Sequence, residues 1–250
     1  MKKLLALLLA GCMIFAFAAC DGNDNDGATE PPVVAMTYAE FMAAELEAEC
    51  VVEFYVQAFQ GWWFNSEVNS GVITLYGQTE EGGYFSYNTK CDEATAALIV
   101  PGTKVRVTGA TKADFDGEVE VMDGTLEILE ADPWIAPKLD VTALLGTDEL
   151  ISHMNKKMEI KGATVVAKND EGAVFYYKWN NAGKEGDDLY FDIQVGDKTY
   201  TMVVESYLCG LGTETYEAVR GLQVGDVIDL EGFLYWYQGP QPHITAVVKK

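Results

Sequence analysis

Aromatic side chains stand beside asparagine or glutamine in three short stretches, and this combination is suited to binding a sugar. The stretches are residues 60–65 (QGWWFN), 175–181 (FYYKWNN) and 233–239 (FLYWYQG). A flat ring can stack on a pyranose face while a neighbouring amide binds its hydroxyl groups. The candidate ligand-binding residues are therefore Trp62, Trp63, Tyr177, Trp179, Tyr235, Trp236 and Tyr237. The alternative, which is the simpler one, is that these rings pack in a core or an interdomain contact.

The sequence contains no recognisable catalytic or metal-binding pattern. His153 and His243 lie outside metal motifs, and no nucleophile elbow, P-loop or dinucleotide fingerprint occurs. A dyad of Cys209 and His243 is conceivable, but one cysteine and one histidine carry little information in a chain of this length. The acids around Asp187 and Asp188 are expected to be solvated loop charges rather than a calcium site. We therefore expect no enzyme activity, no catalytic residue, no cofactor and no bound metal.

The N-terminal segment carries the clearest signal in the chain. Lys2 and Lys3 precede an apolar run over residues 4–19, and Cys20 is followed at once by the polar stretch DGNDNDG. A basic start, an apolar run too short for a membrane span and small residues before the boundary are typical of a secretory signal. The cysteine at the boundary makes this segment similar to the signals of bacterial surface lipoproteins of the Gram-positive type.

This resemblance implies that Cys20 is lipidated and anchors the protein to the extracellular face of the cytoplasmic membrane. Residues 1–19 are then the signal peptide, and residues 20–36 form a flexible acidic tether that cannot bury enough apolar surface to fold. Cys12 is a competing cleavage position, but it leaves a shorter apolar run and a greasy tail on the mature chain. Secretion without a lipid is the remaining alternative.

The chain is strongly acidic, with 39 Asp and Glu against 17 Lys and Arg and a net charge of −22 at pH 7. We expect no nucleic-acid partner, because nucleic-acid affinity rests on basic residues that displace counterions. Cys50, Cys91 and Cys209 are odd in number and match no zinc spacing. A Cys50–Cys91 disulfide is one alternative, and buried free thiols are the favoured interpretation.

The sequence also repeats itself. Residues 102–109 (GTKVRVTG) and 225–232 (GDVIDLEG) begin and end with glycine and alternate between apolar and polar residues, as half-buried strands do. A short helix is expected before each, over residues 93–100 and 214–222. A further strand is expected after each, over residues 119–129 and 244–248.

The front parts of the two repeats are also alike. Strands are expected over residues 51–59 and 158–166. Thr37 is expected to open a helix with a capping box, and Thr147 to cap its equivalent. Residues 80–85 match residues 170–175, which leaves about 33 extra residues in the second repeat. We assign these to an added β-hairpin over residues 189–205.

Each repeat reads helix, three strands, helix, two strands, which is the order of an OB-fold barrel. The glycine-flanked fourth strand is similar to that of bacterial extracellular OB-fold domains. The expected fold is mainly β, with two tandem OB-like five-stranded barrels and short helices. The domains are expected at residues 37–132 and 141–250 (the latter with the inserted hairpin), joined by the linker 133–140. A pair of β-sandwich domains is the main rival, and the interposed helix counts against it.

The expected function is that of a non-enzymatic extracellular binding or adaptor module for a glycan or a protein. The lipid tether, the aromatic loops and the missing catalytic groups lead to this interpretation. One alternative is a structural or accessory subunit of an envelope complex. Another is a hydrolytic enzyme that uses Cys209 or His243. The fold alone does not name a ligand, because one scaffold hosts many functions.

Overall fold

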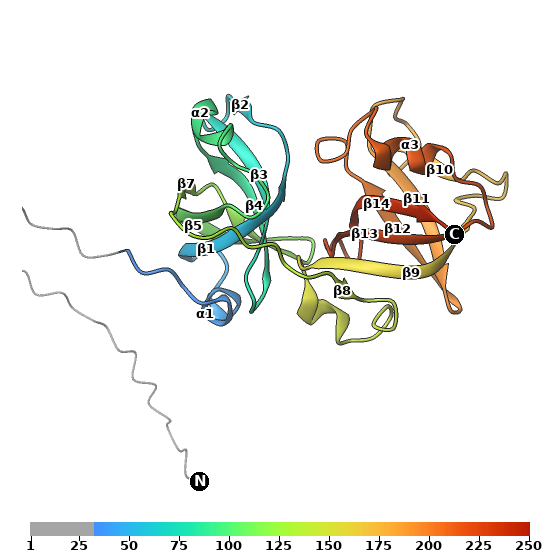
Figure 1. Cartoon of the computed structure of the whole chain (residues 1–250), viewed down its shortest axis with the longest axis horizontal. Helices are drawn as coiled ribbons and strands as arrows, with labels where there is room; N and C mark the ends of the chain where they lie inside the picture. The colour runs from blue at the N-terminus through green and yellow to red at the C-terminus, as the bar shows by residue number, and fades with distance from the viewer. Residues whose placement is uncertain (1–32) are drawn as a thin grey trace, which may run out of the picture. The chain divides into compact units, whose positions relative to one another are not determined.

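The structure is a computed structural model that describes residues 33–250, and these residues form one compact unit. The predicted signal peptide, the predicted lipidation site Cys20 and the predicted tether up to residue 32 lie outside the described residues. No helix of residues 33–250 has the length and apolar character needed to cross a membrane. Two β-barrels follow one another along this part of the chain, coloured blue to green and yellow to red in Figure 1.

The first barrel is a seven-stranded sheet closed on itself. Strand β1 pairs with β3 on one side and with β5 on the other. Strand β3 pairs with β4, and β4 pairs in parallel with both β6 and β7. Strands β6 and β7 pair in turn with β5, which closes the ring. This ring of pairings, with α2 before β5, is the OB-fold arrangement. The elements are α1 (Tyr38–Ala43), β1 (Glu49–Phe59), β2 (Trp63–Asn65), β3 (Ser70–Gln78), β4 (Gly83–Lys90), α2 (Glu93–Ala96), β5 (Lys104–Phe115), β6 (Glu118–Met122) and β7 (Thr125–Ile128).

The second barrel repeats this ring. Strand β9 pairs with β11 and β13, β11 with β12, β12 in parallel with β14, and β14 with β13. The predicted fold of two tandem OB-like barrels is thereby confirmed, and the β-sandwich alternative is excluded. The elements are β8 (Leu139–Asp140), a 3₁₀ helix (Leu150–His153), β9 (Lys157–Val166), β10 (Phe175–Tyr177), β11 (Leu189–Val195), β12 (Lys198–Val204), α3 (Glu214–Arg220), β13 (Val227–Phe233) and β14 (His243–Lys249).

Local sequence signals account for much of the first barrel. The predicted capping box is present, with Glu40 N donating to Thr37 Oγ1 at 3.2 Å and Thr37 N donating to the Glu40 carboxylate at 2.8 Å. Strand β1 places Val52, Phe54 and Val56 in the core by simple alternation. Each barrel has its own buried apolar core, and the two cores share no residue.

Strand β5 continues past Gly109, where the sequence predicts its end. Gly109 has φ of +61°, and the pairing of β5 with β1 shifts register between Val107 and Ala110. A glycine without a Cβ accommodates the backbone of such a β-bulge at little cost. The strand therefore bends at Gly109 and runs on to Phe115, which brings that ring toward the second barrel.

The predicted role of the added hairpin is wrong. Strands β11 and β12 form a hairpin, but they are the second and third strands of the barrel itself. The second barrel is longer in two connections instead. Residues 167–188, with β10, stand where the first barrel has 60–69, with β2, and residues 205–213 stand where it has 91–92. The error arises because residues 170–175 resemble residues 80–85 in sequence. The structural counterpart of the turn before β4 is the turn between β11 and β12.

Two smaller predictions also differ from the structure. The single strand expected over residues 119–129 is divided into β6 and β7, because the chain turns at Asp123, whose φ is +62°. Thr147 caps no helix. Its hydroxyl donates to the backbone carbonyl three residues earlier at 2.7 Å, and the 3₁₀ helix that follows has no side-chain cap.

Candidate functional site

An aromatic cluster joins the two barrels beside the candidate site. It consists of Tyr76 and Phe85 from the first barrel and Phe233 and Tyr235 from the second, all buried. Tyr76 and Phe85 are direct partners on β3 and β4, so both rings leave the same face of the sheet. The ring centroids of Tyr76 and Phe233 are 4.7 Å apart, and those of Phe85 and Tyr235 are 5.1 Å apart. The outer face of β3 and β4 is apolar because the second barrel covers it.

Hydrogen bonds fix this contact between the barrels. Glu118 of β6 is fully buried, and its carboxyl accepts hydrogen bonds from Asn155 Nδ2 and from the backbone N of Trp236. Gln78 Oε1 accepts another from the backbone N of Lys157 at 2.8 Å. The acceptors belong to the first barrel and the donors to the second, so each barrel satisfies polar groups of the other.

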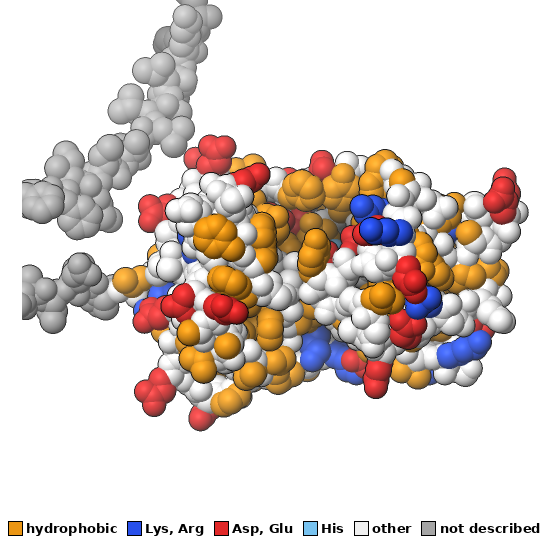
Figure 2. Space-filling view, turned by 90° about the horizontal axis from the view of Figure 1, so that it is seen from above, with side chains coloured by type: hydrophobic (Ala, Val, Ile, Leu, Met, Phe, Trp, Pro, Cys, Tyr) orange, Lys and Arg blue, Asp and Glu red, His pale blue; other side chains and the backbone are white. Residues whose placement is uncertain are grey.

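A cavity of about 920 Å³ opens beside this contact, and we call it the central cavity. Strands β3 and β4 of the first barrel contribute to its wall, and this is the face on which OB-folds generally bind ligands. Figure 2 shows hydrophobic side chains gathered around a hollow in the face seen there. The lining residues are Gln60, Gly61, Trp62, Trp63, Thr74, Phe85, Tyr87, Phe115, Glu120, Met122, Glu205, Tyr207, Tyr235 and His243.

Several rings of the central cavity are open to solvent. Trp63, Tyr87, Phe115 and Tyr207 are between 39% and 76% exposed. Single exposed apolar residues are ordinary on a protein surface, but a group of them around one cavity indicates a binding surface. The lining contains no lysine or arginine. The polar groups that the cavity offers are therefore acidic, amide, hydroxyl and imidazole groups.

Glu120 of β6 lines the cavity and is only 4% exposed. The parallel pairing of β4 with β6 sets it directly beside Phe85. Within residues 33–250 its carboxyl accepts no hydrogen bond and forms no ion pair. Burial, with a smaller contribution from Asp114, raises the pKa of Glu120 to about 7. The carboxyl oxygens still reach the cavity, so a ligand bound there can supply the partner that residues 33–250 do not.

Glu205, just after β12, is the second carboxyl of the cavity. Burial and the nearby Asp188 raise the pKa of Glu205 to about 7, although backbone hydrogen bonds such as that from Tyr207 act against the shift. The side-chain Nε2 of Gln60 donates to Glu205 Oε2 at 3.3 Å and to the Tyr76 hydroxyl oxygen at 3.4 Å. Near neutral pH the cavity can thus hold up to two negative charges.

The imidazole of His243 is neutral. Burial lowers the pKa of His243 to about 3. Its Nδ1 lies 2.7 Å from the Tyr76 hydroxyl oxygen. The two groups share one hydrogen bond, with either Tyr76 donating to Nδ1 or Nδ1–H donating to the Tyr76 oxygen according to the tautomer of the imidazole. The ring of Tyr235 stacks on the imidazole at 4.1 Å. These contacts, rather than one to Cys209, hold His243 in place.

Three of the aromatic residues singled out in the sequence line the cavity, namely Trp62, Trp63 and Tyr235. Trp62 also packs on the core of the first barrel, and its Nε1 donates to the carbonyl of Cys91 at 3.0 Å. Trp63 is exposed, whereas Tyr235 is buried in the aromatic cluster. Packing in a core and exposure at a cavity therefore occur side by side among these three residues, and a ligand role for them stays a prediction.

The other four aromatic residues do not line the cavity. Trp236 and Tyr237 lie where the barrels meet, and the ring of Tyr237 packs on that of Phe115 at 5.7 Å. Tyr177 packs against the core of the second barrel. Trp179 is 73% exposed in the turn that follows β10. The aromatic stretch over residues 175–181 thus belongs to the inserted connection rather than to the cavity.

Sequence reasoning missed the acidic side of the site. Residues 118–121 read Glu-Val-Glu-Val, and this alternation places Glu118 and Glu120 on the same face of β6. The pattern indicates two glutamates facing away from the core, but it does not reveal that a second barrel buries them. Glu205 follows an apolar strand and resembles an ordinary loop acid. His243 gave no signal beyond its residue type.

The cysteines of residues 33–250 form no disulfide and belong to no group that could hold a metal ion. Cys50, Cys91 and Cys209 are free thiols, so the alternative of a Cys50–Cys91 disulfide is wrong. Burial raises the pKa of both Cys50 and Cys91 to about 11, which keeps these thiols protonated near neutral pH. In the part of the chain that the structure describes, no group of three or more His, Cys, Asp or Glu could hold a metal ion.

The raised pKa values of three buried glutamates predict that the protein loses stability as pH rises. Burial raises the pKa of Glu118 to about 8, and those of Glu120 and Glu205 to about 7. In the unfolded chain these groups titrate near 4.5, so between that pH and about 8 the folded state binds more protons than the unfolded state. The free energy of unfolding should fall across this window, by about 1.4 kcal/mol for each unit of pKa shift of these acids. Below about pH 6.5 the buried neutral His243 opposes one of the three contributions, so the fall is steepest above that pH.

Urea denaturation at several pH values within this window measures the effect. The variant Glu118→Gln should show a shallower fall, because an amide does not titrate and can still accept the hydrogen bond from the backbone N of Trp236. Glu171→Gln changes an exposed loop acid in the same way and should leave the slope unchanged. A free energy of unfolding that rose with pH through the window would contradict the prediction.

No known sequence family matches this chain, and no curated protein does either. Solved structures of similar fold include the tetrameric p202 HIN2, at 12% identity and a TM-score of 0.29 over 82% of this chain and 95% of that one. A murine DNA-binding protein with double-stranded DNA has 12% identity and a TM-score of 0.36, over 80% of this chain and 96% of that one. A replication protein A heterotrimer bound to single-stranded DNA has 11% identity and a TM-score of 0.35, over 84% of this chain and 51% of that one.

These comparisons contradict two predictions from the sequence. Two of these structures contain DNA. The predicted function as a glycan-binding or adaptor module is therefore not retained. The prediction that the protein has no nucleic-acid partner is not retained either. The reasoning failed because aromatic rings on a barrel face stack on bases as well as on sugars. Net charge, moreover, describes the whole chain and not one face. At these identities the likeness concerns the fold, and the DNA ligand is not transferred to this chain.

Proposed function

We propose that the protein binds an organic cation, a ligand with an ammonium group on an apolar body, in the central cavity. The observation that carries this proposal is Glu120, a buried residue whose carboxyl faces the cavity and has no hydrogen bond or ion pair with any other group of residues 33–250. A cation bound beside it would supply the missing partner. Its positive charge would also favour the ionised carboxyl, whose pKa burial has raised to about 7.

The aromatic lining supports the same ligand. The face of a tryptophan, tyrosine or phenylalanine ring attracts a cation, and aromatic cages bind quaternary ammonium groups in this way. The central cavity has Trp62, Trp63 and Tyr87 on the first barrel and Tyr207 and Tyr235 on the second. The neutral His243 adds no competing positive charge. Together these rings also offer the apolar surface on which the body of the ligand can be buried.

The charge distribution favours a cation over an anion at this position. Glu120 and Glu205 line the cavity without any lysine or arginine, and the chain carries a net charge of −22. A phosphate group at this cavity would meet two carboxyls and no basic partner. A cation would meet two potential counter-ions and a negative surface potential that increases its local concentration.

Calorimetric titration with a matched pair of probes tests the proposal. Benzyltrimethylammonium carries a permanent positive charge, and neopentylbenzene has the same shape without the charge. We expect the cation to bind saturably and about tenfold or more tightly than its neutral isostere, as a desolvated cation–π contact of about 2 kcal/mol implies. Equal binding of the two probes would show an apolar site without cation selectivity and would contradict the proposal.

A single-stranded oligonucleotide serves as the third ligand of this titration. If the oligonucleotide binds and the cation does not, the central cavity is not a cation site and the proposal is wrong. If both ligands bind, competition between them shows whether the oligonucleotide occupies the central cavity or another surface of the protein.

Three further proposals rest on the sequence alone. Lipidation of Cys20 and anchoring on the extracellular face of the cytoplasmic membrane follow from the resemblance of residues 1–20 to a lipoprotein signal. A binding role without catalysis follows from the lack of a catalytic motif in the sequence. On these proposals the central cavity would meet its ligand outside the cell.

A further inference from the structure

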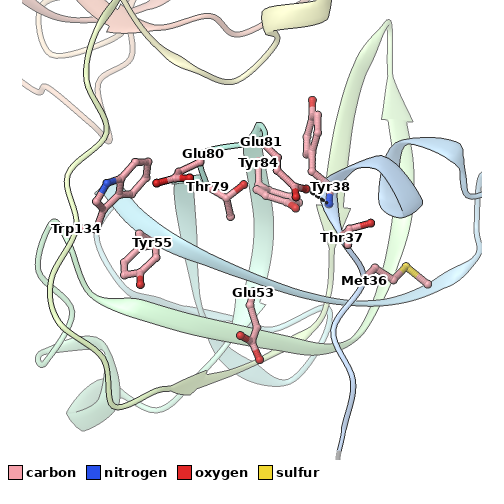
Figure 3. A pocket seen from close by; sticks show the side chains of 10 residues that line it. All are labelled: Met36, Thr37, Tyr38, Glu53, Tyr55, Thr79, Glu80, Glu81, Tyr84 and Trp134. Atoms are coloured by element: carbon pink, nitrogen blue, oxygen red, sulfur yellow. Dashed lines mark hydrogen bonds between the residues drawn. The ribbon is translucent and has the colours of Figure 1, made fainter.

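The first barrel has a second cavity, of about 410 Å³, which shares no lining residue with the central cavity. It lies between the start of α1, strand β1, the turn from β3 to β4 and Trp134 of the segment that leads to the second barrel (Figure 3). We call it the linker cavity. Four aromatic rings and three carboxyls contribute to its wall, and no lysine or arginine does.

The rings of the linker cavity are held in fixed positions. Tyr55 and Trp134 lie 5.4 Å apart between centroids at an interplanar angle of 59°. The buried Gln57 holds the backbone of the linker, since its Nε2 donates to the carbonyl of Trp134 at 3.3 Å and its Oε1 accepts from Ala136 N at 2.8 Å. Trp134 is therefore fastened to the first barrel although it belongs to the connection between barrels.

The other two rings are fixed by the helix α1. Tyr38 and Tyr84 pack edge to face at 5.3 Å. The backbone N of Tyr38 donates to Glu81 Oε2 at 3.1 Å, which ties the start of α1 to the turn between β3 and β4. The wall is thus assembled from three separate segments by specific hydrogen bonds. Such a wall has a defined shape before any ligand arrives.

Three side chains of this cavity, Glu80, Glu81 and Tyr84, keep acceptor atoms that no other group of residues 33–250 uses. Tyr84 is only 1% exposed, yet its hydroxyl makes no hydrogen bond within residues 33–250. Glu80 and Glu81 form no ion pair there, and Glu80 extends toward the Trp134 side of the cavity in Figure 3. Glu53 differs, because Lys104 at 2.9 Å and Arg106 at 2.6 Å already neutralise it. The cavity therefore offers the Glu80 carboxylate, the Glu81 oxygen that Tyr38 N does not use, and the Tyr84 hydroxyl.

We propose that the linker cavity binds a guanidinium group, as presented by an arginine side chain or a small guanidino compound. A guanidinium is planar and stacks on aromatic faces such as those of Trp134 and Tyr55. Its five N–H donors match the acceptors of Glu80 and Glu81 and the oxygen of the Tyr84 hydroxyl. An ammonium group has three donors and no flat face, so it fits this wall less well.

Fluorine NMR of protein labelled with 5-fluorotryptophan tests this proposal site by site. The chain has five tryptophans. Trp134 reports on the linker cavity, Trp62 and Trp63 report on the central cavity, and Trp179 and Trp236 line neither. Each signal is assigned by the corresponding Trp→Phe variant. Binding at the two cavities is thereby observed separately in one titration.

The probes are N-acetyl-arginine methylamide for a peptide arginine and agmatine for a free guanidino compound. We expect one or both to shift the Trp134 signal saturably, and the tighter of the two identifies the source. The citrulline analogue, which has the same shape without charge, should not bind. The lysine analogue should bind about tenfold more weakly, because it cannot stack or bridge two carboxylates.

Variants decide whether the cavity itself is responsible. The double variant Glu80→Gln/Glu81→Gln should weaken the response of Trp134 about tenfold or more while the spectrum stays that of the folded protein. Tyr84→Phe removes only the free hydroxyl and should weaken it by a smaller factor. Glu45→Gln, an exposed acid outside the cavity, is the matched control. A Trp134 signal unmoved by both guanidino probes, or equally moved in the double variant, overturns the proposal.

Discussion

Replacing Gly83 by alanine is expected to lower the free energy of unfolding by about 3 kcal/mol and to weaken ligand binding in the central cavity. Gly83 is the first residue of β4, and it is buried against the second barrel. A methyl group at this position would overlap the backbone carbonyl group of Asn155 and the backbone N of Lys156.

The second barrel cannot easily yield to this methyl group. Asn155 N donates to the carbonyl of Leu234 at 2.9 Å, and Lys156 N donates to the carbonyl of His153 at 3.1 Å. Because the atoms in conflict are backbone atoms held by hydrogen bonds, relief requires that the two barrels separate. Separation would expose the aromatic cluster and remove one wall of the central cavity.

Urea denaturation and calorimetric titration with benzyltrimethylammonium measure the two effects. Gly221→Ala is the matched control, because it adds the same methyl group with its nearest neighbours at ordinary distances of 3.5 and 3.6 Å. Hydrogen exchange at the amide of Trp236, which donates to Glu118, reports directly on the contact between the barrels. If Gly83→Ala were as stable as the control and protected this amide equally, the tight approach of the barrels would be wrong.

The substitution Glu120→Gln is expected to weaken binding of benzyltrimethylammonium in the central cavity by about 30-fold or more. An amide has nearly the same size as the carboxyl, so the change removes the counter-ion while the cavity keeps its shape. Removing one partner of a desolvated charge pair costs more than removing an exposed one, because the remaining charge is left without compensation. Glu171→Gln removes an exposed acid of the second barrel and should leave the affinity unchanged.

The affinity for this probe should also rise with pH. The charge of a quaternary ammonium does not change with pH, so the dependence reports on the protein. Burial raises the pKa of Glu120 and Glu205 to about 7, and only their ionised forms attract a cation. Affinity should therefore be low below pH 7 and increase through it, with protons released on binding. In Glu120→Gln the increase should shrink to the part due to Glu205, and an unchanged pH profile would exclude Glu120 as the counter-ion.

Local patterns in the sequence were sufficient for most of the fold. The capping box at Thr37, the alternation of β1 and the glycine-flanked strands predict elements that the structure contains, because each depends on neighbours a few residues away. The assignment of β11 and β12 as an insertion failed for the opposite reason. Membership of a barrel depends on which distant strand each one pairs with, and two similar acidic turns misled the alignment of the repeats.

The candidate site was only partly visible in the sequence. The stretches around Trp62 and Tyr235 are conspicuous because tryptophan and tyrosine cluster there, and both line the central cavity. Glu120 was not visible, since its functional character comes from burial and from the lack of a partner rather than from its residue type. The same holds for Tyr84 of the linker cavity, whose hydroxyl is notable only because the surrounding elements leave it unpaired.

The amino-acid sequence was sufficient to predict two tandem barrels, most of the strands of the first barrel and the stretches in which aromatic residues cluster. These properties follow from hydrophobic periodicity, turn residues and composition, which act over short stretches of chain. The position of β6 against the second barrel depends on contacts between distant parts of the chain. It buries Glu118 in hydrogen bonds and leaves Glu120 without one from residues 33–250. The physical reason is desolvation: the cost of a charge depends on the atoms around it, and the contact between the barrels determines those atoms.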